Sequence, residues 1–223
     1  MTRREFGQYC GLARALELVG ERWAMLIIRE LLVRPCRYTD LIEGLPGIPT
    51  NMLSTRLKEL EQAGIVERRI ASAPQRGVVY AVTEHGRSLE PALIALAVWG
   101  NTRLNEQQPT DLVPPSSLVI SMRARFNREA AGGMSAVWEI RVPETVLHAV
   151  VTDGQLTAGI GPAPSKPDLV VTVPGEVVPT FRNVLEAIAA GKVELTGRRS
   201  LAGAFTRVFT PQQQALSVSA RTV

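Results

Sequence analysis

Residues 37–64, with the sequence RYTDLIEGLPGIPTNMLSTRLKELEQAG, decide the fold of the first part of this chain. They predict a short helix over 39–44, a turn rich in helix breakers over 44–48, and a longer helix over 50–63. Gly64 stands where a C-terminal helix cap belongs. The segment therefore predicts two helices joined by a tight turn.

The helix expected over 50–63 has two different faces. Its apolar stripe is made of Leu53, Leu57 and Leu60. With about 100° between successive residues, polar side chains gather on the far side. These are Asn51, Ser54, Thr55, Lys58 and Gln62. Such a helix can rest on its own domain and offer hydrogen-bonding groups to base edges in a major groove. Almost any surface helix shares this pattern, so the helix alone does not establish DNA binding.

Two places on the same helix favour contact with phosphate. Arg56 lies at the flank of the polar face, where we expect a phosphate contact rather than a base contact. Thr50 and Asn51 open the helix, and N–H groups at a helix N-terminus can point at a phosphate. Base reading and phosphate binding should therefore be separable by mutation.

A hairpin is expected directly after this helix. Short β-branched runs at 65–70 and 78–82 are separated by a segment that contains Pro74 and Gly77. Basic and polar residues on the first strand and at the tip would form a charged finger suited to minor-groove or backbone contact. They are Arg68, Arg69, Gln75 and Arg76. A solvated hairpin is the alternative. Two helices followed by such a hairpin are typical of a winged helix-turn-helix.

Three further helices are expected around this centre. They lie over 12–19, 23–32 and from about 83 to 104. The last has a wide apolar side, which needs a partner surface from the same domain or from a second copy of the chain.

An ordered set of short motifs in the first hundred residues resembles the HxlR family of bacterial winged helix-turn-helix regulators. The motifs include Glu21-Arg22-Trp23, Arg37-Tyr38-Thr39-Asp40-Leu41, the run from Leu53 to Leu60, the run from Ala63 to Arg68, and Trp99-Gly100. The resemblance implies a homodimeric transcription regulator that binds double-stranded DNA. It also implies that the N-terminal helix and the helix after the wing form the dimer interface. The chain departs from the usual family pattern at Cys36 and at 49–51, so the operator sequence cannot be carried over.

Two recognition helices of such a dimer would enter successive major grooves about 34–36 Å apart.

The same resemblance makes Cys10 a candidate redox sensor, because some members sense electrophiles or oxidants through a cysteine near the N-terminus. A reactive thiol needs a lowered pKa, which a helix start and Arg14 could supply. Packing in the core is the competing and preferred explanation for Cys10 and for Cys36.

The second half of the chain has a different pattern. Residues 107–117, QQPTDLVPPSS, hold three prolines and read as a linker. We therefore expect a DNA-binding and dimerisation domain over 1–106 and a second domain over 118–223. The second domain begins with a helix and continues with four strands, a helix, a strand and a final helix over 200–209. This order predicts an α+β fold.

Residues 168–173 and 190–197 of this domain, with Leu201, Phe205 and Phe209, resemble the sterol carrier protein type 2 domain. The resemblance implies a curved sheet covered by helices, with an apolar tunnel for a lipid-like ligand. The candidate wall residues are Met122, Phe126, Trp138, Phe181, Leu185, Phe205 and Phe209. A plain core and a degenerate domain that serves only in dimerisation are the alternatives. Arg198 stands where that family commonly has an acidic residue.

Composition and motif spacing argue against several other classes of protein. The net charge is +4 and the chain has two cysteines and two histidines at no metal-ligand spacing, so neither a metal nor a cofactor is expected. Glycine-containing segments at 133–137, 159–162 and 191–193 lack the spacing of catalytic or phosphate-binding loops, which argues against an enzyme. No apolar stretch is long enough to span a bilayer and no secretory signal is evident, so we expect a cytoplasmic protein.

The sequence thus predicts an HxlR-type regulator that binds operator DNA as a homodimer, with a hydrophobic ligand in the second domain as a candidate effector. The alternative is a carrier of a lipid-like ligand whose N-terminal half serves mainly for dimerisation. Basic residues on the hairpin and the polar helix face favour the regulator.

Overall fold

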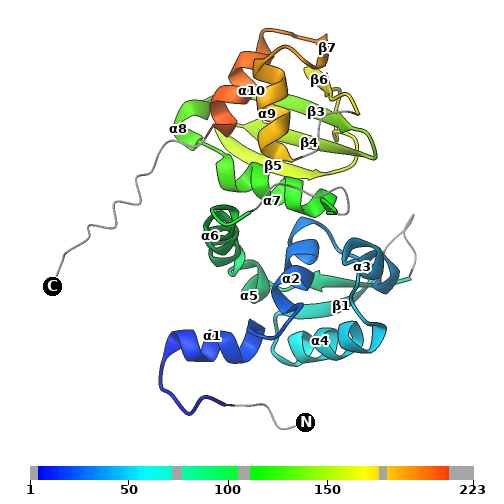
Figure 1. Cartoon of the computed structure of the whole chain (residues 1–223), viewed down its shortest axis with the longest axis vertical. Helices are drawn as coiled ribbons and strands as arrows, with labels where there is room; N and C mark the ends of the chain where they lie inside the picture. Colours follow the sequence, from blue (N-terminus) through cyan, green and yellow to red (C-terminus); the bar gives the residue numbers. More distant parts are fainter. Residues whose placement is uncertain (1–4, 72–76, 105–110, 176–179, 211–223) are drawn as a thin grey trace, which may run out of the picture. The chain divides into compact units, whose positions relative to one another are not determined.

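A computed structural model describes residues 5–71, 77–104, 111–175 and 180–210 of the chain. It divides the protein into two compact units, Met1–Ile120 and Ser121–Val223 (Figure 1). The division falls inside helix α7 (Pro115–Arg125). Residues 115–117, which the sequence analysis assigned to the linker, form the first turn of α7, where proline is tolerated because its missing N–H has no helical partner. Residues 107–110 of that linker lie outside the described part.

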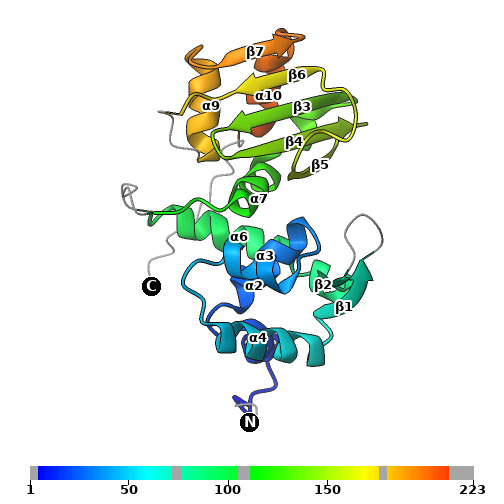
Figure 2. The ribbon, with the colours of Figure 1, turned by 90° about the vertical axis from the view of Figure 1, so that its right-hand side faces the viewer.

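The first unit is a winged helix-turn-helix with flanking helices (Figures 1 and 2). Its helices are α1 (Gly11–Val19), α2 (Ala24–Val33), α3 (Tyr38–Gly44), α4 (Thr50–Gln62), α5 (Glu84–Arg87) and α6 (Glu90–Asn101). The hairpin consists of β1 (Val66–Ala71) and β2 (Gly77–Val82). The helix–turn–helix–hairpin order predicted from the sequence is therefore confirmed.

The core of this unit collects the apolar stripe of each helix. Leu53, Leu57 and Leu60 of α4 are all buried, as their spacing predicted. They meet a cluster that includes Ile27 and Ile28 of α2. Burying a leucine or isoleucine side chain contributes about 1.5–3 kcal/mol, so this stripe fixes which face of α4 points outward.

The two ends of the hairpin are tied to neighbouring elements. Gly64 follows the cap of α4 with a φ of 69°, a left-handed conformation that glycine adopts without steric cost, and it turns the chain into β1. Cys36, just before α3, exchanges two backbone hydrogen bonds with Tyr80 of β2, at 3.0 and 2.7 Å. The base of the wing is therefore joined to the chain on both sides of the helix-turn-helix.

The single helix expected from about 83 to 104 is two helices. Thr83 caps α5 as expected, with its side chain accepting a hydrogen bond from the Gly86 amide. The chain then breaks at Ser88 and Leu89 before α6 begins. Pro91 lies in the first turn of α6, where it fits, but in a continuous helix it would remove one hydrogen bond and clash with the preceding turn.

The start of α7 is part of the first unit's core. The Ser116 hydroxyl is fully buried and donates to the Glu30 carboxylate of α2 at 2.6 Å. Arg29 donates to the same carboxylate oxygen, with its Nε at 3.0 Å. Ile120 joins the apolar cluster around α2. The first unit therefore includes residues beyond the proline-rich segment.

The second unit contains a mixed five-stranded sheet in the order β5-β4-β3-β6-β7. The strands are β3 (Ala136–Val142), β4 (Thr145–Thr152), β5 (Gln155–Ile160), β6 (Leu169–Thr172) and β7 (Glu194–Gly197). Only the β3–β6 pair is parallel. The helices are α8 (Arg128–Ala131), α9 (Phe181–Ala189) and α10 (Leu201–Phe209), and Figure 2 shows α9 and α10 on one side of the sheet. The mixture of helices and sheet agrees with the expected class.

The aromatic residues among the candidate tunnel residues pack against one another. Met122, Trp138, Phe205 and Phe209 are fully buried, and Phe181 and Leu185 are buried as well, while Phe126 is half-buried. The ring centroids of Phe205 and Phe209 lie 4.7 Å apart, and each lies 5.4–6.4 Å from the rings of Trp138 and Phe181, edge to face. This packing is what a core requires, and the ligand role of these residues stays a prediction.

The opposite face of the sheet holds a buried acid that the sequence analysis missed. Glu139 of β3 lies opposite His148 of the paired strand β4. The Glu139 carboxylate accepts a hydrogen bond from the Ala163 amide at 3.1 Å and forms an ion pair with Arg141 at 2.7 Å. Burial alone would raise the pKa of Glu139, but the Ala163 amide and Arg141 outweigh it and hold this pKa below its usual value. His148 contacts the Gly161 carbonyl at 3.0 Å. The segment after β5 is thus fastened to the sheet.

Candidate nucleic-acid interface

The polar face of α4 is exposed along its length. Thr50, Asn51, Ser54, Thr55 and Lys58 are all exposed, and they lie opposite the buried leucines. Pro49 precedes the helix and supplies no side-chain cap. Because Pro49, Thr50 and Asn51 are exposed, the positive end of the helix dipole is accessible from outside. The helix can therefore offer both hydrogen-bonding side chains and N-terminal amides to an external anion.

Internal hydrogen bonds orient the side chains on this face. The Thr55 hydroxyl donates to the Asn51 carbonyl at 2.8 Å, and the Asn51 Oδ1 accepts from the Met52 amide at 2.8 Å. Each hydroxyl oxygen still has lone pairs for an incoming donor, and the Asn51 amide nitrogen still has its N–H groups to give. Thr55 and Asn51 are thus held in defined positions and keep the capacity to recognise a base edge.

Tyr38 clamps α3 to the start of α4. Its hydroxyl donates to the Thr50 carbonyl at 2.7 Å and lies 3.0 Å from the Ser54 hydroxyl. Ser54 also donates to the Thr50 carbonyl at 3.0 Å. This role of Tyr38 was not predicted from the sequence, where its signal is an aromatic hydroxyl at the beginning of the helix preceding the turn. The clamp fixes the angle between the two helices that define the fold.

Arg56 differs from the expectation of a phosphate ligand at the flank. Its side chain is only 12% exposed, and its guanidinium pairs with Glu59 on the same helix and with Glu21 in the turn before α2, the latter at 3.0 Å. The geometry gives Arg56 two carboxylate partners inside the protein, and these compete with any phosphate.

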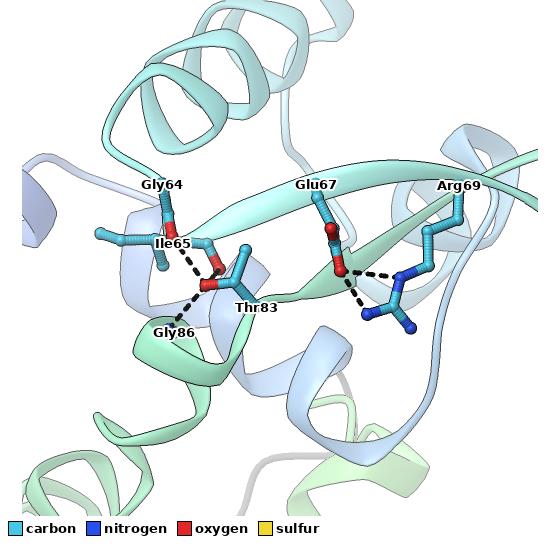
Figure 3. Close-up of polar contacts among 6 residues, drawn as sticks. All are labelled: Gly64, Ile65, Glu67, Arg69, Thr83 and Gly86. Carbon is cyan, nitrogen blue, oxygen red and sulfur yellow. Dashed lines mark hydrogen bonds and ion pairs between the residues drawn. The ribbon is translucent and has the colours of Figure 1, made fainter.

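The wing presents charged and apolar side chains together. Arg68 is exposed, with its guanidinium 6.0 Å from the centre of the Tyr80 ring, and Arg69 is exposed and pairs with Glu67 (Figure 3). Gln75 and Arg76, the residues expected at the tip, lie outside the described part of the chain. Ile70 and Val78 form a cross-strand pair on the wing that was not predicted as part of the site, and Ile70 is 87% exposed.

Thr83 fastens the base of the wing, as Figure 3 shows. Its hydroxyl donates to the Gly64 carbonyl at 2.6 Å and accepts from the Gly86 amide at 3.0 Å. One side chain therefore joins the end of α4, the end of β2 and the beginning of α5. This arrangement fixes where the wing leaves the helix that carries the polar face.

Apolar side chains are exposed on α1, on the segment before it, and on α6. They are Phe6, Tyr9, Leu12, Leu16, Leu96, Val98 and Trp99. Trp99 is 67% exposed, and no charged residue occurs between Glu90 and Arg103. An exposed apolar surface of this kind is typical of a protein–protein contact.

The two cysteines lie in opposite environments. Cys10 is exposed at the N-cap of α1, where the Ala13 and Leu12 amides lower the pKa of its thiol. Packing, which the sequence analysis preferred for Cys10, is therefore the wrong explanation for this residue. Cys36 is buried, its thiol lies 3.4 Å from the Arg34 carbonyl, and burial raises its pKa to about 12. The packing explanation fits Cys36.

The described residues hold neither a candidate metal cluster nor a helix that could span a membrane. No group of three or more His, Cys, Asp or Glu side chains could hold a metal ion within that part of the chain. None of the helices described has both the length and the apolar character needed to cross a membrane.

The first unit is similar in sequence to known proteins. The family model for the HxlR-like helix-turn-helix matches residues 18–108. An uncharacterised HTH-type transcriptional regulator of Synechocystis sp. is 33% identical over 103 residues, which are 46% of this chain and 76% of the relative. The HTH-type transcriptional regulator YodB of Bacillus subtilis is 39% identical over 87 residues, 39% of this chain and 78% of YodB. A solved structure of reduced YodB is 34% identical, covering 45% of this chain and all of that one, with a TM-score of 0.38.

These matches cover the unit that carries the helix-turn-helix and the wing. The shared sequence spans more than two thirds of the Synechocystis and Bacillus relatives, which are named as regulators of transcription. The chain therefore belongs to the HxlR-like helix-turn-helix family of transcriptional regulators.

Proposed function

We propose that this regulator binds operator DNA as a homodimer, with α4 in the major groove and the wing on the flanking backbone. The observation that carries the proposal is the two-faced α4: its leucines are buried while Asn51 and Thr55 stand exposed beside the basic hairpin. A recognition helix needs this combination of one face buried in its own domain and an opposite polar face that is free to contact bases.

The exposed residues divide into two roles. Asn51, Ser54 and Thr55 have side chains that can read base edges. Lys58 and Arg68 carry exposed positive charges suited to phosphate, and the Thr50 end of the helix offers amides to the same kind of group. Arg56 is left out of both sets, because Glu59 and Glu21 already occupy its guanidinium.

The experiment is fluorescence anisotropy with fragments selected from genomic DNA, repeated across a salt series. Lys58→Ala should weaken binding to all sequences and lower the salt slope by about 1. Asn51→Ala and Thr55→Ala should instead change the ratio between selected and random DNA. Arg128→Ala removes an exposed arginine of the second unit and is the matched control. Equal loss of binding in all four variants would contradict the assignment of the reading face.

The homodimer part of the proposal rests on the exposed apolar residues of α1 and α6. A second copy of the chain can cover Leu12 and Leu16 of α1 together with Leu96 and Trp99 of α6. Helix α6 has no charged residue after Glu90. Trp99→Glu should shift the mass measured by sedimentation from dimer to monomer. Val78→Glu, which changes an exposed valine on the wing, should leave that mass unchanged.

We also propose that Cys10 senses oxidants or electrophiles. Its exposure and the lowered pKa support a reactive thiolate, and its position at the beginning of α1 is beside the surface proposed for the dimer. Treatment with a thiol oxidant should alter DNA binding of the wild-type chain and leave Cys10→Ser unaffected. Cys36→Ser is the control that should respond like the wild type.

For the second unit we propose a sterol-carrier-like domain that takes a hydrophobic ligand. The sheet with helices on one side and the aromatic cluster around Trp138 support the resemblance, and the Trp138 Nε1 is buried without a hydrogen-bond partner among the described residues. Native mass spectrometry of the purified chain should reveal a retained small molecule. A mass equal to that of the bare polypeptide would favour a plain core.

A further inference from the structure

Arg56 is held from two sides at the flank of the helix proposed to read DNA. One guanidinium nitrogen pairs with Glu59 one turn further along α4, and the other lies 3.0 Å from the Glu21 carboxylate. The Nε is buried and has no hydrogen-bond partner among the described residues. The arginine therefore lies across the surface of α4 towards the turn before α2, with its charge met by two carboxylates.

The turn that carries Glu21 is itself tightly fixed. Trp23 has a φ of 78°, which a bulky residue rarely adopts, and its ring packs against the core while Arg22 stacks over it at 5.4 Å. The Gly20 amide donates to the Leu16 carbonyl at 2.8 Å, and a side chain at Gly20 would come within 2.5 Å of that oxygen. The backbone beside Glu21 thus has little freedom to move relative to α1.

We propose that Glu21 and Arg56 form a positioning pair that sets the orientation of α4 relative to α1. The inference rests on the proposed DNA-binding function. It adds Glu21 as a positioning residue that acts through Arg56. The helices α1 and α4 are in contact, and α1 carries part of the surface proposed for the dimer. The pair therefore couples two quantities: the distance between the two copies in the proposed dimer and the direction in which each α4 points.

The alternative role of Arg56, as a phosphate ligand, predicts a change in DNA affinity of the opposite sign. If Arg56 were a phosphate ligand, Glu21 would compete with DNA for the guanidinium, and Glu21→Gln would strengthen binding. If Arg56 positions α4, Glu21→Gln loosens the helix and weakens binding to the selected sequence. Because Glu21 is 61% exposed, the expected loss is modest, about two- to fivefold in affinity, with binding to random DNA nearly unchanged.

The experiment measures four variants of the full chain by anisotropy with selected and random DNA. Glu21→Gln and Arg56→Gln should lower the ratio of specific to random binding by similar factors, and the double variant should lose no more than either alone. Neither should change the salt slope, whereas removal of a phosphate ligand lowers it by about 1. Glu61→Gln, which removes an exposed negative charge from the same helix, is the matched control for a general charge effect.

A second measurement separates failure of this inference from failure of the proposed function. Without DNA, hydrogen exchange of the α4 amides should speed up in Glu21→Gln and in Arg56→Gln and stay at the wild-type rate in Glu61→Gln. Wild-type chain that binds no DNA would overturn the proposed function while exchange still reports on the pair. Stronger DNA binding by Glu21→Gln, or unchanged exchange in α4, would overturn the positioning role.

Discussion

Replacing Thr83 by valine tests how the wing is held to the rest of the first unit. Valine keeps the shape of threonine but loses the hydroxyl, which donates to the Gly64 carbonyl at 2.6 Å and accepts from the Gly86 amide at 3.0 Å. Gly86 is buried, so its amide would lose its cap where water has little access. Loss of a helix cap with a buried unsatisfied donor costs about 2 kcal/mol.

For a unit of this size that cost corresponds to a fall in melting temperature on the order of 5–10 °C. Urea unfolding followed by circular dichroism gives the free energy, and hydrogen exchange of the hairpin peptides locates the effect. Thr83→Ser keeps the hydroxyl and should stay within about 0.5 kcal/mol of the wild type. If the serine variant loses as much stability as the valine variant, the hydroxyl does not hold the wing and the reasoning fails.

Three further predictions concern the core, the clamp and the buried acid. Leu57→Ala should cost about 2–5 kcal/mol in urea unfolding, because it empties a fully enclosed site under α4. Tyr38→Phe should cost about 1 kcal/mol and reduce specific DNA binding measured by anisotropy, since the hydrogen bond to the Thr50 carbonyl is lost; an unchanged affinity would remove the clamp from the binding mechanism. Because the folded-state pKa of Glu139 is lowered, its stabilising effect is complete above the ordinary glutamate pKa of about 4.3 and is lost as the pH falls through the folded value. Glu139→Gln should therefore destabilise the chain at pH 7 and flatten the acid limb of a stability-against-pH curve, and parallel acid limbs would contradict this.

Local patterns predicted the elements of the helix-turn-helix well. The leucine spacing in α4 and the capping glycine after it are properties of neighbouring residues, and helical geometry converts them directly into a buried stripe and an end point. The hairpin followed from two β-branched runs in the same way. Such patterns predict which face of a helix is free, because the apolar side must be buried.

Contacts between distant parts of the chain were beyond the reach of the same patterns. Nothing near Arg56 in the sequence indicates Glu21, which comes 35 residues earlier and meets it only through the packing of the fold. The exposure of Cys10 likewise depends on the packing of distant parts of the chain, which leaves the beginning of α1 uncovered. The break before α6 could have been predicted from Pro91, whose ring is incompatible with the interior of a continuous helix.

The buried hydroxyl of Ser116 and the apolar side chain of Ile120 have a consequence for how chains of this type can be recombined. Splitting the polypeptide at the prolines would strip Glu30 of a hydrogen-bond donor and leave a hole beside α2. Chimeras that replace the second unit by another domain should therefore remain folded only when their crossover point lies after residue 120.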